Sequence, residues 1–393
     1  MSGYRALHEA AGAVFAETPG GGRARHYGDP AAEYAAAVRS VAVVDRSFRG
    51  RVRVTGRAPV QMLNGVLSGA MPPGPERRDG EALRGRATYS TILTPKGRMV
   101  TDLRVFRLDV GGAGPAPVGR PGAPVALPGA GAGGEALLLD FPADGLPGAL
   151  DHFSRTVPPR FAAVEDVSAA TGHLTLLGPG APALVTREAL GLRVDDAELE
   201  ALAEGQYVAV DSGDGRLLHV ARCGDVATPA LDVMADRRTV EALWRRLLEA
   251  GARPAGHAVW ETLRVEAGRP AFGVDMDEGR IPMEAGLGER AIDHRKGCYT
   301  GQEVIVRIRD RGHVNRYLRG LRLGEAPTPA RGTPLFAPEV RDEAPVGEVT
   351  SAVQSPRFGE AIAMGYVRRE VEPGAVVRVG SVEGGEAVVV ALE

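Results

Sequence analysis

Cysteine is scarce in this chain: its 393 residues include only Cys223 and Cys298. Two cysteines are too few for a disulfide framework or for a metal site built from cysteine alone, so any thiol chemistry must rest on one of them individually. The histidines form no HxxxH pattern, and there is no CxxC pattern. The sequence therefore predicts no preformed metal site.

Long apolar runs are also absent. No stretch approaches the roughly 18 apolar residues of a membrane-spanning helix, and Met1 to Phe15 lacks the basic region and apolar run of a secretory signal. We therefore expect a cytoplasmic protein without a membrane partner. The formal net charge is −3, so no global positive field exists to hold nucleic acid, and we expect no nucleic-acid partner.

The chain exceeds the length at which a single hydrophobic core usually stops growing. Apolar residues make up 44% of it and charged residues 25%, which is ordinary for a globular protein. We expect three domains: an α+β region over 1–150, a second α+β region over 151–312, and a β-barrel over 313–393. The Gly, Ala, Pro and Val that dominate residues 111–134 predict a flexible insertion over 109–136.

Apolar periodicity outlines the secondary structure of both α+β regions. It indicates strands over 41–44, over 51–54 and on either side of a turn at 94–97, and helices over 60–67 and 238–250. Beyond Asn315, short apolar runs separated by Gly and Pro predict a small barrel or sandwich. The expected fold class is therefore α+β with a separate C-terminal β domain.

Cys298 follows Arg295 and Lys296 and precedes a segment, Gly301 to Arg311, whose apolar residues fit one helical face but also alternate as in a strand. If the segment is helical, the thiol lies near positive side chains and a helix N-terminus, which both stabilise a thiolate. Such a cysteine would be nucleophilic or metal-binding. The alternative is a small buried hydrophobic residue in a glycine-rich turn, because free cysteines are most often buried.

Asp102 is the second candidate for chemistry. It lies among Val100, Leu103 and Val105 on a predicted strand that follows the turn at Gly97. A carboxylate in this position could accept a hydrogen bond from a ligand nitrogen. The alternative is an exposed strand residue without a function.

The octet Lys296-Gly297-Cys298-Tyr299-Thr300-Gly301-Gln302-Glu303 resembles the K-G-C-Y-x-G-Q-E signature of the YgfZ family, relatives of the T-protein of the glycine cleavage system. Segments similar to this superfamily cover nearly the whole chain outside the insertion, and they include 44–47, 54–56, 263–268, 272–273, 282–287, 346–351 and 364–367. The resemblance implies a three-domain GcvT-like ring around a central channel, with a small C-terminal β-barrel.

The resemblance also implies a ligand and a set of site residues. The ligand is tetrahydrofolate or a one-carbon-substituted folate, and the binding residues carried over by position are Tyr89, Asp102, Arg264, Glu266, Gly301, Gln302 and Glu303. Cys298, Lys296 and Asp102 are the implied catalytic residues. The implied role is that of an accessory factor for assembly or repair of 4Fe–4S clusters, with iron–sulfur client or assembly proteins as partners.

Two departures separate the chain from the T-proteins that it resembles. T-proteins carry paired aspartates, one of them catalytic, where Thr101 and Asp102 stand here, and their pterin-binding Gly-Glu-Asp-Gly segment is replaced by the Ala-Thr-Pro-Ala of 227–230. T-proteins also lack a cysteine at the position of Cys298. The alternative function is a folate-dependent aminomethyltransferase or demethylase in which Asp102 positions or deprotonates the reacting nitrogen. A third is a binding module that recognises a partner protein through its barrel.

Overall fold

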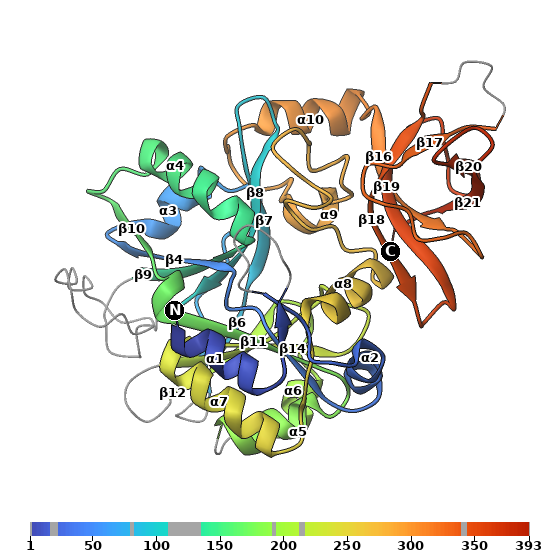
Figure 1. Cartoon of the computed structure of the whole chain (residues 1–393). Helices are drawn as coiled ribbons and strands as arrows, with labels where there is room; N and C mark the ends of the chain where they lie inside the picture. The colour runs from blue at the N-terminus through green and yellow to red at the C-terminus, as the bar shows by residue number, and fades with distance from the viewer. Residues whose placement is uncertain are drawn as a thin grey trace.

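The computed structural model describes residues 2–15, 23–78, 82–108, 135–190, 194–211, 217–338 and 344–392. Two layered α/β parts lie beside a barrel that forms one end of the molecule (Figure 1). The predicted insertion over 109–136 lies outside the described residues except for Glu135 and Ala136, which begin a strand. None of the described helices has the length and apolarity required to span a membrane.

A five-stranded antiparallel sheet has the strand order β10-β4-β9-β8-β7. Its strands are β4 (Gly50–Gly56), β7 (Thr88–Leu93), β8 (Met99–Arg107), β9 (Glu135–Phe141) and β10 (Ala162–Asp166). Helices α3 (Pro59–Asn64) and α4 (Leu146–Thr156) cover one face. Because side chains alternate along a strand, β8 directs Leu103 and Val105 into this apolar layer and Asp102 toward the other face.

An eight-stranded sheet has the order β15-β3-β11-β14-β13-β12-β6-β5. Its strands are β3 (Ala42–Asp45), β5 (Glu76–Arg78), β6 (Ala82–Arg86), β11 (Thr171–Leu177), β12 (Gln206–Asp211), β13 (Leu217–Arg222), β14 (Ala230–Asp236) and β15 (Arg253–Pro254). Helices α5 (Ala181–Val185), α6 (Asp196–Glu200) and α7 (Arg237–Glu249) cover one face.

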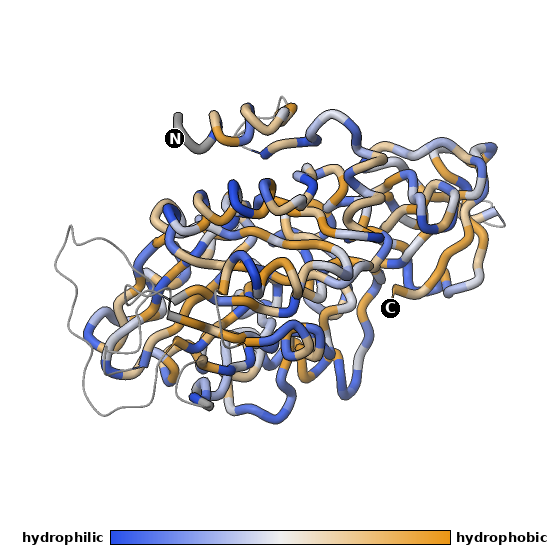
Figure 2. Tube along the Cα trace, turned by 90° about the horizontal axis from the view of Figure 1, so that it is seen from below, coloured by the Kyte–Doolittle hydropathy of each residue, from blue (hydrophilic) through white to orange (hydrophobic). Residues whose placement is uncertain are grey.

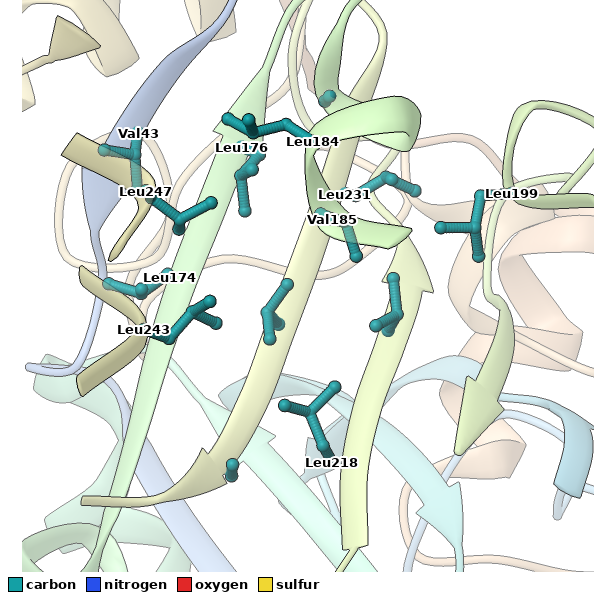
Figure 3. Close-up of a cluster of buried hydrophobic side chains, with 14 of the residues drawn as sticks. Val43, Leu174, Leu176, Leu184, Val185, Leu199, Leu218, Leu231, Leu243 and Leu247 are labelled. Atoms are coloured by element: carbon teal, nitrogen blue, oxygen red, sulfur yellow. The ribbon is translucent and has the colours of Figure 1, made fainter. Parts of the chain in front are cut away.

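Helix α7 confirms the helix predicted over 238–250. It begins where the Asp236 carboxylate accepts hydrogen bonds from the backbone N–H groups of Arg238 and Thr239. Its apolar face buries Trp244 and packs Leu243 and Leu247 among the leucines and valines of the sheet (Figure 3). The periodicity was a reliable guide because this helix has one apolar face and one solvent-facing side.

The remaining faces of the two sheets pack against each other through an apolar layer that includes Phe106, Leu138, Tyr207 and Met234. Both sheets combine strands from before and after residue 150, so neither is contained within one of the first two predicted domains. Figure 2 shows that apolar segments fill the interior of this part, while α1 (Ser2–Ala10) lies at its periphery.

The other short elements connect these layers. They are β1 (Val14–Phe15), β2 (Ala24–His26), α2 (Pro30–Arg39), α8 (His257–Glu266), α9 (Gly288–Ala291), α10 (Gln302–Arg311), the 3-10 turns η1 (Ala143–Gly145) and η2 (Ser168–Ala170), and the π-helical turn η3 (Thr186–Leu190). Helix α10 confirms the helical interpretation of 301–311, and the strand alternative is wrong. Its start requires Gly301, which has φ +84 and whose missing Cβ would lie 2.6 Å from the Thr94 carbonyl oxygen.

The C-terminal part is a closed six-stranded barrel, as the sequence predicted. Its strands are β16 (Arg316–Arg322), β17 (Pro334–Phe336), β18 (Gly347–Ser355), β19 (Glu360–Arg368), β20 (Val376–Val379) and β21 (Gly385–Val390). Helix α8 joins it to the sheets, because Val265 packs with Leu318 and Ile362. The mixed α/β architecture with this barrel confirms the predicted fold class.

Candidate functional site

Two cavities adjoin between the sheets, α8 and the residues around α9. The large cavity has a volume of about 590 Å³, and the Asp102 cavity has about 90 Å³. Tyr89, Arg104, Asp225 and Arg290 line both of them, so the two cavities meet at these four side chains. The lining residues come from both sheets and from loops far apart in the sequence.

Asp102 lies in the smaller cavity and is only 8% exposed. Its Oδ2 accepts a hydrogen bond of 2.6 Å from the Tyr89 hydroxyl, whereas its buried Oδ1 has no partner among the described residues. Burial raises the pKa of this carboxyl. The alternative of an exposed strand residue is therefore wrong, and the unpartnered oxygen is available to a ligand donor.

Thr101 and Asp102 stand where T-proteins carry paired aspartates, and of the two only Asp102 lines the cavity. The Thr101 side chain is fully buried on the opposite face of β8, where it lies against Gly145 and donates to the Asp102 carbonyl oxygen at 3.0 Å. An aspartate at position 101 would therefore point away from the cavity. The carboxylate that this chain retains is the one that lines it.

Arginines outnumber carboxylates by seven to four in the lining of the Asp102 cavity. Three of them are held by buried aspartates on neighbouring strands: Asp140 pairs with Arg49 and Arg104, and Asp232 pairs with Arg46 and also with His173. The guanidinium groups hold the pKa of Asp140 well below its usual range, although burial alone would raise it.

This charged network was not predicted from the sequence. Asp140 ends the apolar run Leu137-Leu138-Leu139, and Asp232 interrupts another apolar strand. A carboxylate within a strand that is otherwise buried is the signal that could have revealed it, because buried carboxylates need paired partners.

Arg290 occupies the boundary between the cavities. Its Nη2 lies 2.8 Å from an Asp225 carboxylate oxygen and 2.5 Å from one of Glu204, and its guanidinium carbon lies 4.3 Å from the centre of the Tyr89 ring. Tyr89 in turn donates to Asp102, and burial raises the pKa of its hydroxyl well above its usual value. Sequence reasoning singled out Tyr89 and Asp102, but not Arg290.

Arg264 and Glu266, both on α8, differ in their relation to the cavities. Arg264 lies at the edge of the Asp102 cavity, but its donors are engaged by Glu261, Asp275, Ser351 and the Arg269 carbonyl oxygen. Glu266 lines neither cavity and instead accepts hydrogen bonds from the hydroxyls of Tyr34 and Ser355, the latter in the barrel. Both residues join α8 to neighbouring parts of the fold, and their contact with folate stays a prediction.

The octet lies outside both cavities. Cys298 is exposed, so the alternative of a buried hydrophobic residue is wrong for it, whereas Cys223 is buried. Lys296 donates from Nζ to the carbonyl oxygens of Leu67 and Gly69 at 2.8 and 2.9 Å, and burial lowers its pKa to about 8. The structure therefore does not bring Cys298 and Lys296 together with Asp102 in one cavity.

The last three candidates of the octet form the start of α10. Gly301 precedes the first turn, and Gln302 and Glu303 begin it, with Glu303 exposed. None of the three lines either cavity, and their part in binding folate stays a prediction. No group of three or more His, Cys, Asp and Glu in the described part of the chain could hold a metal ion.

Comparison with known proteins agrees with the fold. The GCVT N-terminal domain family model matches residues 142–296, and the glycine cleavage T-protein C-terminal barrel domain model matches residues 316–392. The chain carries both domains and belongs to the GcvT-like superfamily.

Relatives extend the likeness over nearly the full length. The chain is 28% identical to an aminomethyltransferase of Rubrobacter xylanophilus, over 93% of this chain and 87% of the relative, and 29% identical to one of Corynebacterium jeikeium, over 96% and 92%. The crystal structure of aminomethyltransferase T of the glycine cleavage system from Bartonella henselae has the same fold, with a TM-score of 0.78 at 20% identity over 98% of this chain and 95% of that one. The finer resemblance to YgfZ stays a prediction.

Proposed function

We propose that this chain binds a reduced folate, tetrahydrofolate or a one-carbon-substituted form, at Asp102 and catalyses a one-carbon transfer of the aminomethyltransferase type. The observation that carries the proposal is the buried Asp102 Oδ1, which has no hydrogen-bond partner in the described part of the chain and belongs to a residue lining a cavity. The relatives named aminomethyltransferase support the same class of reaction.

The chemistry of the lining residues fits a folate. The ligand combines N–H donors on a fused ring with carboxylates at its other end. Asp102 offers an acceptor for a ring N–H, and the arginine excess of the lining favours an anionic ligand. When bound, tetrahydrofolate supplies the nitrogen that accepts a one-carbon unit.

Within this site, Asp102 has the role of proton acceptor. Tyr89 fixes one carboxylate oxygen at 2.6 Å and leaves the other free to take a proton from a ligand nitrogen. Burial raises the pKa of Asp102, and a raised pKa makes the carboxylate a better base near neutral pH. The network around Asp140 and Asp232 holds the neighbouring arginines in place.

Asp102→Asn tests this proposal. We expect tetrahydrofolate to bind the wild type in calorimetry, and methylene- or methyl-tetrahydrofolate to form from glycine-cleavage intermediates, dimethylglycine or sarcosine. The variant should lower the rate about 10²- to 10⁴-fold, as expected for the loss of a general base. Asp151→Asn, at an exposed carboxylate on α4, is the matched control and should leave the rate unchanged. Absence of any heat or thermal stabilisation with tetrahydrofolate would remove the folate part of the proposal.

A second candidate function rests on Cys298. We propose it as the group through which the chain supports assembly or repair of 4Fe–4S clusters in client proteins, because this thiol is exposed and lies outside the two cavities. An exposed thiol is accessible to another protein. The resemblance of the octet to the YgfZ signature supports this role.

Complementation of a bacterium lacking its YgfZ protein tests the second candidate. Cys298→Ala should fail to restore the activity of 4Fe–4S enzymes. Cys223→Ala is the matched control, since Cys223 is buried and burial raises the pKa of its thiol far above the usual range. Undiminished rescue by Cys298→Ala, at equal protein levels, would refute the role of the thiol.

A further inference from the structure

Arg290 is positioned to control the geometry of the pair formed by Tyr89 and Asp102. It belongs to α9, on the same segment as the octet, and its side chain is 18% exposed. Its carboxylate partners come from two separate loops, Glu204 before β12 and Asp225 after β13. A planar guanidinium bound from two sides has a fixed orientation, and the Tyr89 ring rests on it.

We propose that Arg290 is the positioning residue of this site: it holds the Tyr89 ring so that the hydroxyl donates to Asp102, and it neutralises Asp225 beside them. The inference rests on the proposed function, because the carboxylate that Arg290 positions is the one assigned to the ligand. Arg290 itself acts through Tyr89 and Asp225.

The charged and titratable groups around Asp102 define what Arg290 can change. Tyr89 faces Asp102 from β7, Arg49 from the loop after β3, and Asp225 from the loop after β13. Tyr89 and Arg49 lower the pKa of Asp102, whereas Asp225 raises it. Without Arg290, Asp225 loses its partner at 2.8 Å, and the cations that remain near it among the described residues are the more distant Arg46, at 3.9 Å, and Arg104.

Removal of Arg290 should therefore raise the pKa of Asp102 in two ways. The Tyr89 ring loses the surface that orients its hydroxyl, which weakens a hydrogen bond that favours the ionised carboxylate. Asp225 becomes a less compensated negative charge, which disfavours ionisation of Asp102. Both changes raise the pKa of Asp102. The Asp102 carboxylate, no longer held in one orientation, should also accept a hydrogen bond from a ligand N–H less strongly.

The chain offers a matched control at Arg280. Its guanidinium stacks on Tyr366 at 3.8 Å and pairs with Glu348 at 3.0 Å, so it makes the same two kinds of contact as Arg290. It lines neither cavity. Arg280→Met therefore removes an equivalent stack and ion pair from a different part of the fold.

The experiment compares Arg290→Met, Arg290→Lys and Arg280→Met with the wild type. The first readout needs no ligand: the carboxyl ¹³C shift of Asp102, assigned through Asp102→Asn, is titrated by NMR. We expect the titration midpoint to rise in Arg290→Met, to stay nearer to the wild type in Arg290→Lys, which keeps the charge, and to be unchanged in Arg280→Met. The second readout is calorimetry, in which Arg290→Met should bind tetrahydrofolate about tenfold more weakly.

A folded Arg290→Met protein with the wild-type Asp102 titration would overturn the inference, as would an equal shift in Arg280→Met. If Arg290→Met does not fold, Arg290→Gln provides the neutral replacement, and an unchanged midpoint in that variant overturns the inference in the same way. Failure of the wild type to bind tetrahydrofolate would count against the proposed function alone, because the NMR titration still tests the role of Arg290.

Discussion

Acid should destabilise this protein through its buried histidines, and His219 allows the clearest test. This side chain is 1% exposed, its Nδ1 has no hydrogen-bond partner among the described residues, and burial alone lowers its pKa to about 4. In the unfolded chain the pKa of histidine is about 6.5. Between these values the unfolded state binds a proton that the folded state does not, so the free energy of unfolding falls as the pH falls from about 6.5 toward 4.

The magnitude follows from the two pKa values. Between pH 7.5 and pH 5, preferential protonation of the unfolded state at His219 should remove about 2 kcal/mol from the free energy of unfolding. His219→Phe keeps an aromatic ring beside Tyr207, whose ring centre lies 5.8 Å away, and removes the titrating group. Urea unfolding of both proteins at the two pH values should therefore show a drop that is smaller by about 2 kcal/mol in the variant.

His152→Phe is the control for this measurement, because burial also lowers the pKa of His152 but the Asp151 carboxylate opposes the shift, whereas burial acts alone at His219. Its effect on the pH-dependent drop should be smaller than that of His219→Phe. An identical drop in His219→Phe and the wild type would refute the reasoning, since it would mean that His219 is protonated equally in the folded and unfolded chains.

Three further substitutions test contacts around the site. Gly301→Ala should lower the free energy of unfolding by about 1–3 kcal/mol, because Gly301 has a positive φ and an added Cβ would collide with the Thr94 carbonyl oxygen. Gly359→Ala, at φ +70 with open space around it, should lower the free energy of unfolding by less. Arg264→Met should lower the free energy of unfolding, measured with urea, by about 3–5 kcal/mol, because it leaves the buried Asp275 carboxylate without its paired cation. Lys296→Met should lower the melting temperature by removing two hydrogen bonds, and an unchanged value would contradict that role.

The sequence was a good guide to the elements whose two sides differ in polarity. Helix α7 was predictable because Leu243, Trp244 and Leu247 recur on one face, and the barrel because its short strands alternate. Helix α10 remained ambiguous, since Val304, Ile305 and Ile308 fit both periodicities. Its helical form depends on tertiary contacts that the pattern does not contain, including the close approach of Val304 to Gly97 in the β7–β8 turn.

The site was predictable only in part, for a physical reason. Asp102 could be singled out as a carboxylate on a strand, but its burial depends on a second sheet that packs over β8. Arg290 lies in the four-residue helix α9 and Asp225 in a loop, both too short to show a periodicity, and only the fold brings them to Tyr89. Local sequence therefore indicates a residue's chemistry, whereas its partners are set by contacts between distant parts of the chain.

The position of the octet also changes how the two candidate functions relate to each other. Its segment runs from Arg290, which lines the cavities, through Lys296, which is bonded to the loop at Leu67 and Gly69, to the exposed Cys298. The proposed folate chemistry and the proposed thiol chemistry thus use opposite ends of one short segment. Asp102→Asn should impair only the former and Cys298→Ala only the latter. Loss of both activities in either folded variant would show that the two ends act as a single unit.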